Sequence, residues 1–145
     1  MNKTDLRGID KIIKEENAII KIFMDKRFVR KMIISQEEGK DIVFTGPTFK
    51  RLLKSASMQL LGKVKQSQVC VGGVPSFDSK LDEVLKDYYF IIFKDQEQDV
   101  FKMQILNHAN NLRVFHSKVP FKNGVYGLFE NVENFLQKDE KENEI

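Results

Sequence analysis

The feature that most restricts the fold of this chain is a pattern that occurs twice: three short apolar runs, separated by polar turns, are followed by an amphipathic helix. The first block has strand-like runs at residues 18–24, 28–35 and 41–44 and a helix at residues 47–61. The second block has runs at residues 88–94, 100–106 and 112–119 and a helix at residues 125–138. Runs of this length that are rich in β-branched and aromatic residues are typical of strands.

The helix predicted at residues 47–61 has the clearest boundaries. The apolar run before it ends at Thr45-Gly46-Pro47, and proline suits the first turn of a helix because its φ is fixed and it has no N–H to leave unpaired. Apolar residues then recur at spacings of three and four, which is the period of an amphipathic helix. These residues are Phe49, Leu52, Leu53, Ala56, Leu60 and Leu61. We expect Phe49 to pack in the core and Gly62 to end the helix.

The second block predicts a meander. The run Tyr88 to Lys94 is apolar nearly throughout, so we expect a central strand that is buried on both faces. Short turns connect it to the next two runs, which favours three antiparallel strands in sequence. Further helices are predicted at residues 5–16 and 76–86. The fold class is therefore α+β, with an antiparallel sheet or sheets in two β-β-β-α-like blocks and an N-terminal helix.

The domain organisation follows from length and punctuation. A chain of 145 residues is long enough for one domain with its own core. We expect a single α+β domain at residues 1–138, with halves at about 1–71 and 76–138 that meet at Gly72-Gly73 and Pro75. Residues 139–145 are mostly charged and are predicted to be a frayed tail.

Charge is distributed unevenly along the chain. Residues 1–75 hold 15 Lys or Arg and 8 Asp or Glu, a net charge of +7, whereas residues 76–145 hold 9 and 13, a net charge of −4. Such a difference between halves indicates an anionic partner for the basic half, or pairing between the halves of two chains.

The leading hypothesis is a protein that binds nucleic acid, single-stranded DNA or RNA, through a basic surface of the N-terminal half. Basic side chains track phosphates, and aromatic side chains stack on unpaired bases. The candidate nucleic-acid-binding residues are Arg27, Phe28, Arg30, Lys31, Lys50, Arg51, Lys54, Lys63 and Lys65. For the helix at residues 47–61 taken alone, a solvated outer face is the more frequent explanation of its charges.

The succession of strand blocks, each closed by a helix, is similar in outline to the PUR and whirly classes of single-strand-binding proteins. The resemblance concerns architecture only, and no residue role is carried over from it. It implies a sheet that serves as a platform for a single strand.

The alternative hypothesis is a non-enzymatic interaction or assembly module. Such a protein would form a homodimer or larger homo-oligomer through exposed sheet edges and through its oppositely charged halves. Salt separates the two hypotheses, because nucleic-acid binding weakens steeply as counterions accumulate whereas an apolar contact between subunits persists.

Catalytic and metal-binding patterns are missing from the sequence. His108 and His116 are the only histidines, and no Cys/His cluster has the spacing of a metal site. Cys70 is the single cysteine, which excludes an internal disulfide and favours a reducing, cytoplasmic location. No apolar run approaches the length of a membrane span. We therefore expect a cytoplasmic protein that is not an enzyme and uses no cofactor.

Overall fold

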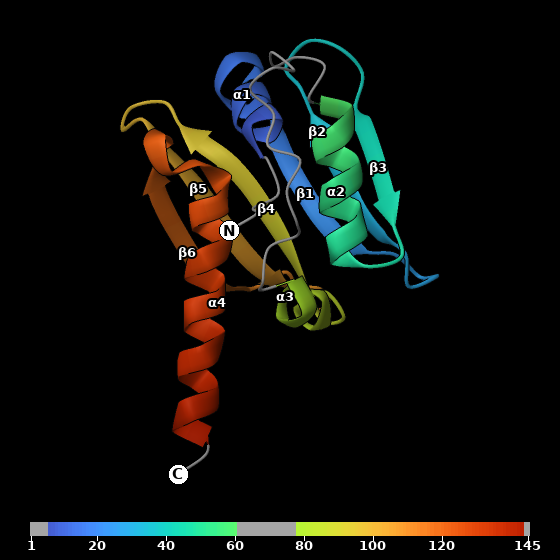
Figure 1. The fold of residues 1–145 in the computed structure, drawn as a ribbon, viewed down its shortest axis with the longest axis vertical. Helices are drawn as coiled ribbons and strands as arrows, with labels where there is room; N and C mark the ends of the chain where they lie inside the picture. Colours follow the sequence, from blue (N-terminus) through green and yellow to red (C-terminus); the bar gives the residue numbers. More distant parts are fainter. Residues whose placement is uncertain (1–5, 61–77, 144–145) are drawn as a thin grey trace.

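The computed structural model describes residues 6–60 and 78–143, and its two strand blocks form one six-stranded sheet (Figure 1). The first block comprises α1 (Arg7–Glu16), β1 (Ile19–Met24), β2 (Arg30–Ser35), β3 (Ile42–Gly46) and α2 (Phe49–Leu60). The second comprises α3 (Asp78–Val84), β4 (Tyr88–Asp95), β5 (Val100–Asn107), β6 (Arg113–Pro120), the 3-10 helix η3 (Phe121–Asn123) and α4 (Gly124–Asn143).

The strand order is β3-β2-β1-β4-β5-β6, so each block forms one half of the sheet, and the first strand of each block lies at the centre. Each half is an antiparallel meander, and the two meanders are joined by antiparallel pairing of β1 with β4, where Lys21 lies opposite Ile91. The predicted α+β class, the antiparallel sheet and the N-terminal helix are confirmed.

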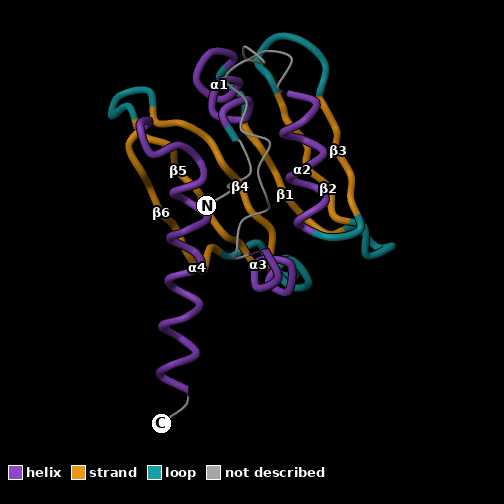
Figure 2. Tube along the Cα trace, in the orientation of Figure 1, coloured by secondary structure: helices purple, strands orange, loops and turns teal. Residues whose placement is uncertain are grey.

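The helices lie together on one face of the sheet, as Figures 1 and 2 show. Alternate residues of each strand point toward this helical layer and are buried, as Ile20 and Ile22 of β1 are. Phe49 of α2 is fully buried between Phe90 and Phe129, with ring centroids at 6.2 and 5.5 Å in edge-to-face geometry. The prediction that Phe49 belongs to the core is confirmed.

Local chemistry explains where the helices begin and end. Asn17 adopts a left-handed conformation, with φ of 52°, and terminates α1 as the sequence predicts. The Thr48 hydroxyl accepts a hydrogen bond from the Arg51 N–H in the first turn of α2. The Asp10 carboxylate accepts the Val125 N–H at 2.9 Å, which ties the first turn of α4 to α1.

Two predictions about the second block need correction. The strand β4 is central, but it is not buried on both faces: Phe90 and Ile92 on the helix-facing side are buried, whereas Ile91 and Phe93 on the other side are only half-buried. The helix α4 continues to Asn143, beyond the predicted end at Lys138, because the charged residues that follow include good helix formers. The predicted extended segment at residues 63–71 lies outside the described residues.

Candidate nucleic-acid interface

We call the side of the sheet that faces away from the helices the open face. No described helix covers it (Figure 1). Since side chains alternate along a strand, every second strand residue points to this face. Its most exposed apolar members are Ile19 and Val43, which are about half exposed. Its other members include Lys21, Phe23, Lys31, Ile33, Thr45, Tyr89, Ile91, Phe93, Lys102, Gln104, Leu106, His116 and Lys118.

Nearly all the charged residues in the six strands are basic. Asp95 is the single acidic residue in the six strands. The basic strand residues are Lys21, Arg30, Lys31, Lys94, Lys102, Arg113 and Lys118. The helix α4, by contrast, has five acidic and two basic residues in its sequence. The sheet is therefore basic and α4 is acidic, in addition to the difference in net charge between the two halves of the chain.

A hollow of about 380 Å³ lies on the open face across β4, β5 and β6. Its lining residues are Phe93, Lys102, Met103, Gln104, Arg113, His116, Ser117 and Lys118. We call this site the sheet hollow. Arg113, His116 and Lys118 are exposed, and none of their side chains has a hydrogen-bond or ion-pair partner among residues 6–60 and 78–143. Lys102, in contrast, contacts the Asp95 carboxylate at 2.9 Å.

The geometry of β6 brings the side chains of Arg113, His116 and Lys118 to the sheet hollow. Ile105 lies opposite Phe115 and Leu106 lies opposite Arg113, so Val114 is an extra residue in a β-bulge. The bulge turns Arg113 to the same side as His116 and Lys118, which reach the sheet hollow through the regular alternation of the strand. Beside it, the hydrogen bonds that Asp95 accepts from Lys102 and from the Glu97 N–H hold the pKa of its carboxyl below the usual value.

Near the centre of the sheet, aromatic rings and a lysine are stacked together. The Lys21 ammonium lies 5.1 Å from the centre of the Phe23 ring and 4.9 Å from that of Tyr89. Tyr89 is fixed by a hydrogen bond of 2.9 Å from its hydroxyl to Asn111. Phe23 is half-buried, so part of its ring remains open to solvent.

The turn between β1 and β2, residues 25–29, lies at one end of the open face. The Asp25 carboxylate accepts the N–H groups of Arg27 at 2.8 Å and Val29 at 3.0 Å, and it contacts the Lys31 ammonium at 3.3 Å. Burial raises the pKa of Asp25, but these hydrogen bonds and the Lys31 charge outweigh burial and hold the pKa below its usual value. Phe28 projects from this turn and is 73% exposed.

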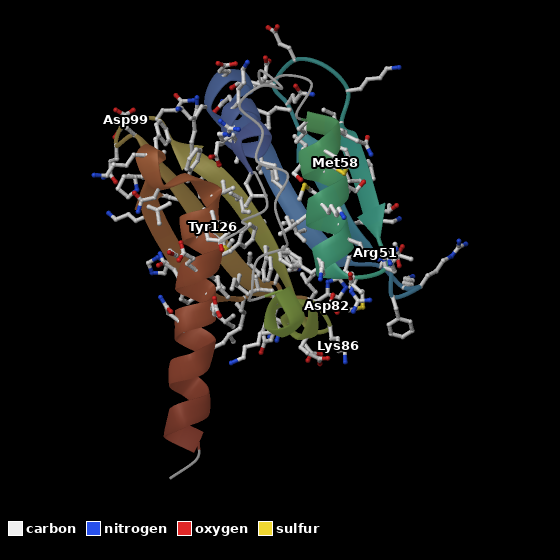
Figure 3. All side chains as sticks on the ribbon, viewed as in Figure 1. Arg51, Met58, Asp82, Lys86, Asp99 and Tyr126 are labelled. Carbon is white, nitrogen blue, oxygen red and sulfur yellow. The ribbon has the colours of Figure 1, made fainter. Side chains whose placement is uncertain are left out.

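Arg30 is a predicted binding residue, but its side chain is engaged in contacts within the protein. Its guanidinium forms a two-pronged ion pair with Asp82 at 2.7 and 2.9 Å. It also donates to the carbonyls of Phe28 and Pro47 at 2.7 and 3.0 Å. Asp82, labelled on α3 near the base of α2 in Figure 3, also accepts the Phe49 N–H. Arg30 therefore ties the β1–β2 turn, the start of α2 and α3 together.

The predicted residues of α2 lie in the helical layer and so on a different side of the molecule from the open face. Lys50, Arg51 and Lys54 line a broad hollow of about 680 Å³ with Thr48, Ser55 and Met58. Figure 3 shows Arg51 near the start of α2 and Met58 farther along the helix. Through the Arg30 contacts, the start of α2 also lies beside the turn that carries Arg27 and Phe28.

The predicted residues are thus brought together only in part. Lys31 is on the open face, Arg27 and Phe28 are at its end, and Lys63 and Lys65 lie outside the described residues. Sequence reasoning missed the residues of the sheet hollow, Phe93, Lys102, Arg113, His116 and Lys118. The signal that could have found them is the alternation of basic and polar residues along two strands without any interleaved acid.

No family model, curated protein or solved structure matches this chain. None of the helices in the described part of the chain has both the length and the apolar character needed to cross a bilayer. Among residues 6–60 and 78–143, no three His, Cys, Asp or Glu side chains are grouped as a metal ion would require.

Proposed function

We propose that this protein binds single-stranded DNA or RNA on the open face of its sheet. The observation that carries the proposal is the composition of that face, where Arg113 and Lys118, whose side chains have no partner among the described residues, lie at the sheet hollow beside partly exposed aromatic rings. Lys and Arg neutralise phosphates, and aromatic rings stack on bases whose faces are free. A single strand offers both groups at once, whereas a duplex hides its base faces.

Each group at the sheet hollow has a chemical role in this proposal. Arg113 and Lys118 bind phosphates, because their charges are not neutralised by other described residues. Phe93 contributes a ring for stacking, and Gln104 contributes an amide that can donate to or accept from a base edge. His116 adds an imidazole whose ring nitrogens can hydrogen-bond to a phosphate or a base edge.

The test compares two variants that remove the same charge from different layers. We expect Arg113→Gln with Lys118→Gln to weaken binding of a labelled single-stranded oligonucleotide about tenfold or more at low salt, measured by fluorescence anisotropy. Arg51→Gln with Lys54→Gln on α2 is the matched control and should weaken binding much less. All four side chains are on the surface, so neither variant disturbs the core.

Salt dependence supplies a second criterion. For single strands, log K falls with log salt concentration by about 0.7 for each phosphate neutralised. Loss of two phosphate contacts should therefore reduce the slope by about 1.4 in the variant of the sheet hollow. A larger loss of affinity in the α2 variant would move the site to α2, and no binding by the unaltered protein would refute the proposed function.

A second candidate function is assembly with another copy of this chain along β6. The strand β6 is an edge of the sheet. Leu112, which precedes this strand, is 65% exposed, and Val114 within it is 52% exposed. An apolar groove of about 310 Å³ adjoins them, lined in part by Phe115, Phe135 and Leu136. An edge strand with apolar neighbours favours continued pairing with a second sheet. Light scattering should give twice the chain mass for the unaltered protein and the monomer mass for Val114→Asp.

A further inference from the structure

We propose that Phe28 is a dedicated stacking residue that takes up one unpaired nucleobase at the end of the open face. This inference rests on the proposed function and adds a defined ligand group, the π face of a base. The evidence comes from the backbone of residues 25–29, from the hydrogen bonds that hold it and from the surroundings of the Phe28 ring.

The backbone of Phe28 is in an unfavourable conformation. Its φ is 64°, in the left-handed region, which glycine and asparagine adopt readily and which a bulky side chain rarely adopts. Turn chemistry alone would therefore favour Gly or Asn at this position. Strained residues of this kind persist where the surrounding structure holds them, and they cluster at functional sites.

Several interactions hold the turn in this form. The backbone N–H of Phe28 donates to the Asp25 carbonyl at 3.0 Å, and the Asp25 N–H donates to the Val29 carbonyl at 2.9 Å. The Asp25 carboxylate and the Arg30 guanidinium add the side-chain hydrogen bonds described above. Because Arg30 is itself fixed to Asp82, the position of Phe28 is tied to the helical layer.

Among residues 6–60 and 78–143, no ring or cation contact with the Phe28 side chain compensates for the strain. Phe28 is 73% exposed, and no aromatic ring or cation packs on it within the described part of the chain. A rigid turn thus presents an aromatic ring to solvent, and it does so at a projecting loop beyond the end of β1 (Figure 1). Such a ring is suited to an external partner that offers a flat, apolar face.

The charges around the ring favour a nucleobase as that partner. Lys26 and Arg27 are exposed and directly precede Phe28, so phosphates on either side of a stacked base would meet cations. Lys31 joins the turn to the open face through its ion pair with Asp25. A strand that lies on the open face can therefore continue to Phe28. Stacking on an exposed aromatic ring accepts any base, so this contact adds affinity without sequence preference.

The substitution Phe28→Asn separates the contribution of the ring to binding from its effect on stability. Asparagine tolerates the left-handed conformation, so we expect the melting temperature to rise by about 3 °C. We expect affinity for a single-stranded oligonucleotide to fall about tenfold, because one stacking contact is lost. Met58→Gln is the control, since it also replaces an exposed apolar side chain with an amide, on α2. It should leave affinity unchanged.

An abasic strand of the same length identifies the chemistry. It keeps the phosphates and lacks the bases, so the unaltered protein and Phe28→Asn should bind it equally. Equal affinity of the two proteins for the normal strand would overturn the inference, and so would an equal loss on the abasic strand. Phe28 would instead belong to a membrane-binding surface if Phe28→Asn bound the normal strand as well as the unaltered protein does but no longer bound phosphatidylserine vesicles that the unaltered protein binds. If the unaltered protein binds no strand, the proposed function fails and this inference fails with it.

Discussion

Substitution of Arg30 by lysine separates a structural role from a role in nucleic-acid binding. The change keeps the positive charge, so electrostatic attraction to phosphates is preserved. It removes the planar guanidinium, which alone can form the two-pronged pair with Asp82 while also donating to the carbonyls of Phe28 and Pro47. We therefore expect Arg30→Lys to lose stability and to keep its affinity for single strands.

The magnitude follows from the bonds that are lost. Arg30 and Asp82 have side chains that are only 11% and 20% exposed, so the pair is largely shielded from water. Removing one partner of a fully buried pair costs about 3–5 kcal/mol, whereas a lysine retains the charge and part of the bonding. We expect a loss of about 2 kcal/mol for Arg30→Lys, since each hydrogen bond to a charged group contributes about 1.5–3 kcal/mol.

Thermal and chemical denaturation measure this loss. A destabilisation of about 2 kcal/mol should lower the melting temperature by about 6 °C in a domain of this size. Arg30→Ala and Asp82→Ala, alone and combined, should show a coupling free energy of at least about 1.5 kcal/mol. A variant Arg30→Lys with an unchanged melting temperature and weaker strand binding would refute the structural role and return Arg30 to the binding surface.

Two further predictions concern the β1–β2 turn and the start of α4. Because the pKa of Asp25 is lower in the folded state, its carboxylate stabilises the fold above the unfolded pKa, and this stabilisation is lost as pH falls through the folded value. An NMR titration should therefore show the Val29 amide signal moving only below the ordinary aspartate range. The variant Asp25→Asn should abolish this transition. At Gly124, φ is 70° and an added Cβ would lie 2.6 Å from Oδ2 of Asp10, so Gly124→Ala should cost about 1–3 kcal/mol of unfolding free energy. A cost below about 0.5 kcal/mol in chemical denaturation would contradict both the backbone strain and the steric conflict with Asp10.

The fold could be predicted from the sequence because its signals are local and mutually consistent. The period of Phe49, Leu52 and Leu53 identifies a helix, and Gly46-Pro47 marks where it starts. The strands of the second block were found because short polar turns separate apolar runs. The joining of both blocks into one sheet could not be predicted in the same way, because the pairing of β1 with β4 links residues about seventy positions apart and leaves no local pattern.

The candidate site was harder to predict, since exposure depends on what the helices cover. Arg30 and Lys31 are adjacent in sequence and look equivalent, yet the alternation of β2 turns Lys31 to the open face and Arg30 toward Asp82 on α3. Arg113 belongs to the sheet hollow through a bulge that sequence patterns do not specify. Phe28 was found from its basic neighbours, but the strain at its backbone is visible only in the structure.

The central claim, that the open face binds a single strand, is tested most directly by an NMR titration of the full chain with a short single-stranded oligonucleotide. We predict that amide signals of β4, β5 and β6 around Phe93, Lys102 and His116 shift together with those of residues 25–29, and that signals along α2 stay in place. Shifts confined to α2, or no shifts at low salt, would contradict the assignment of the open face as the binding surface.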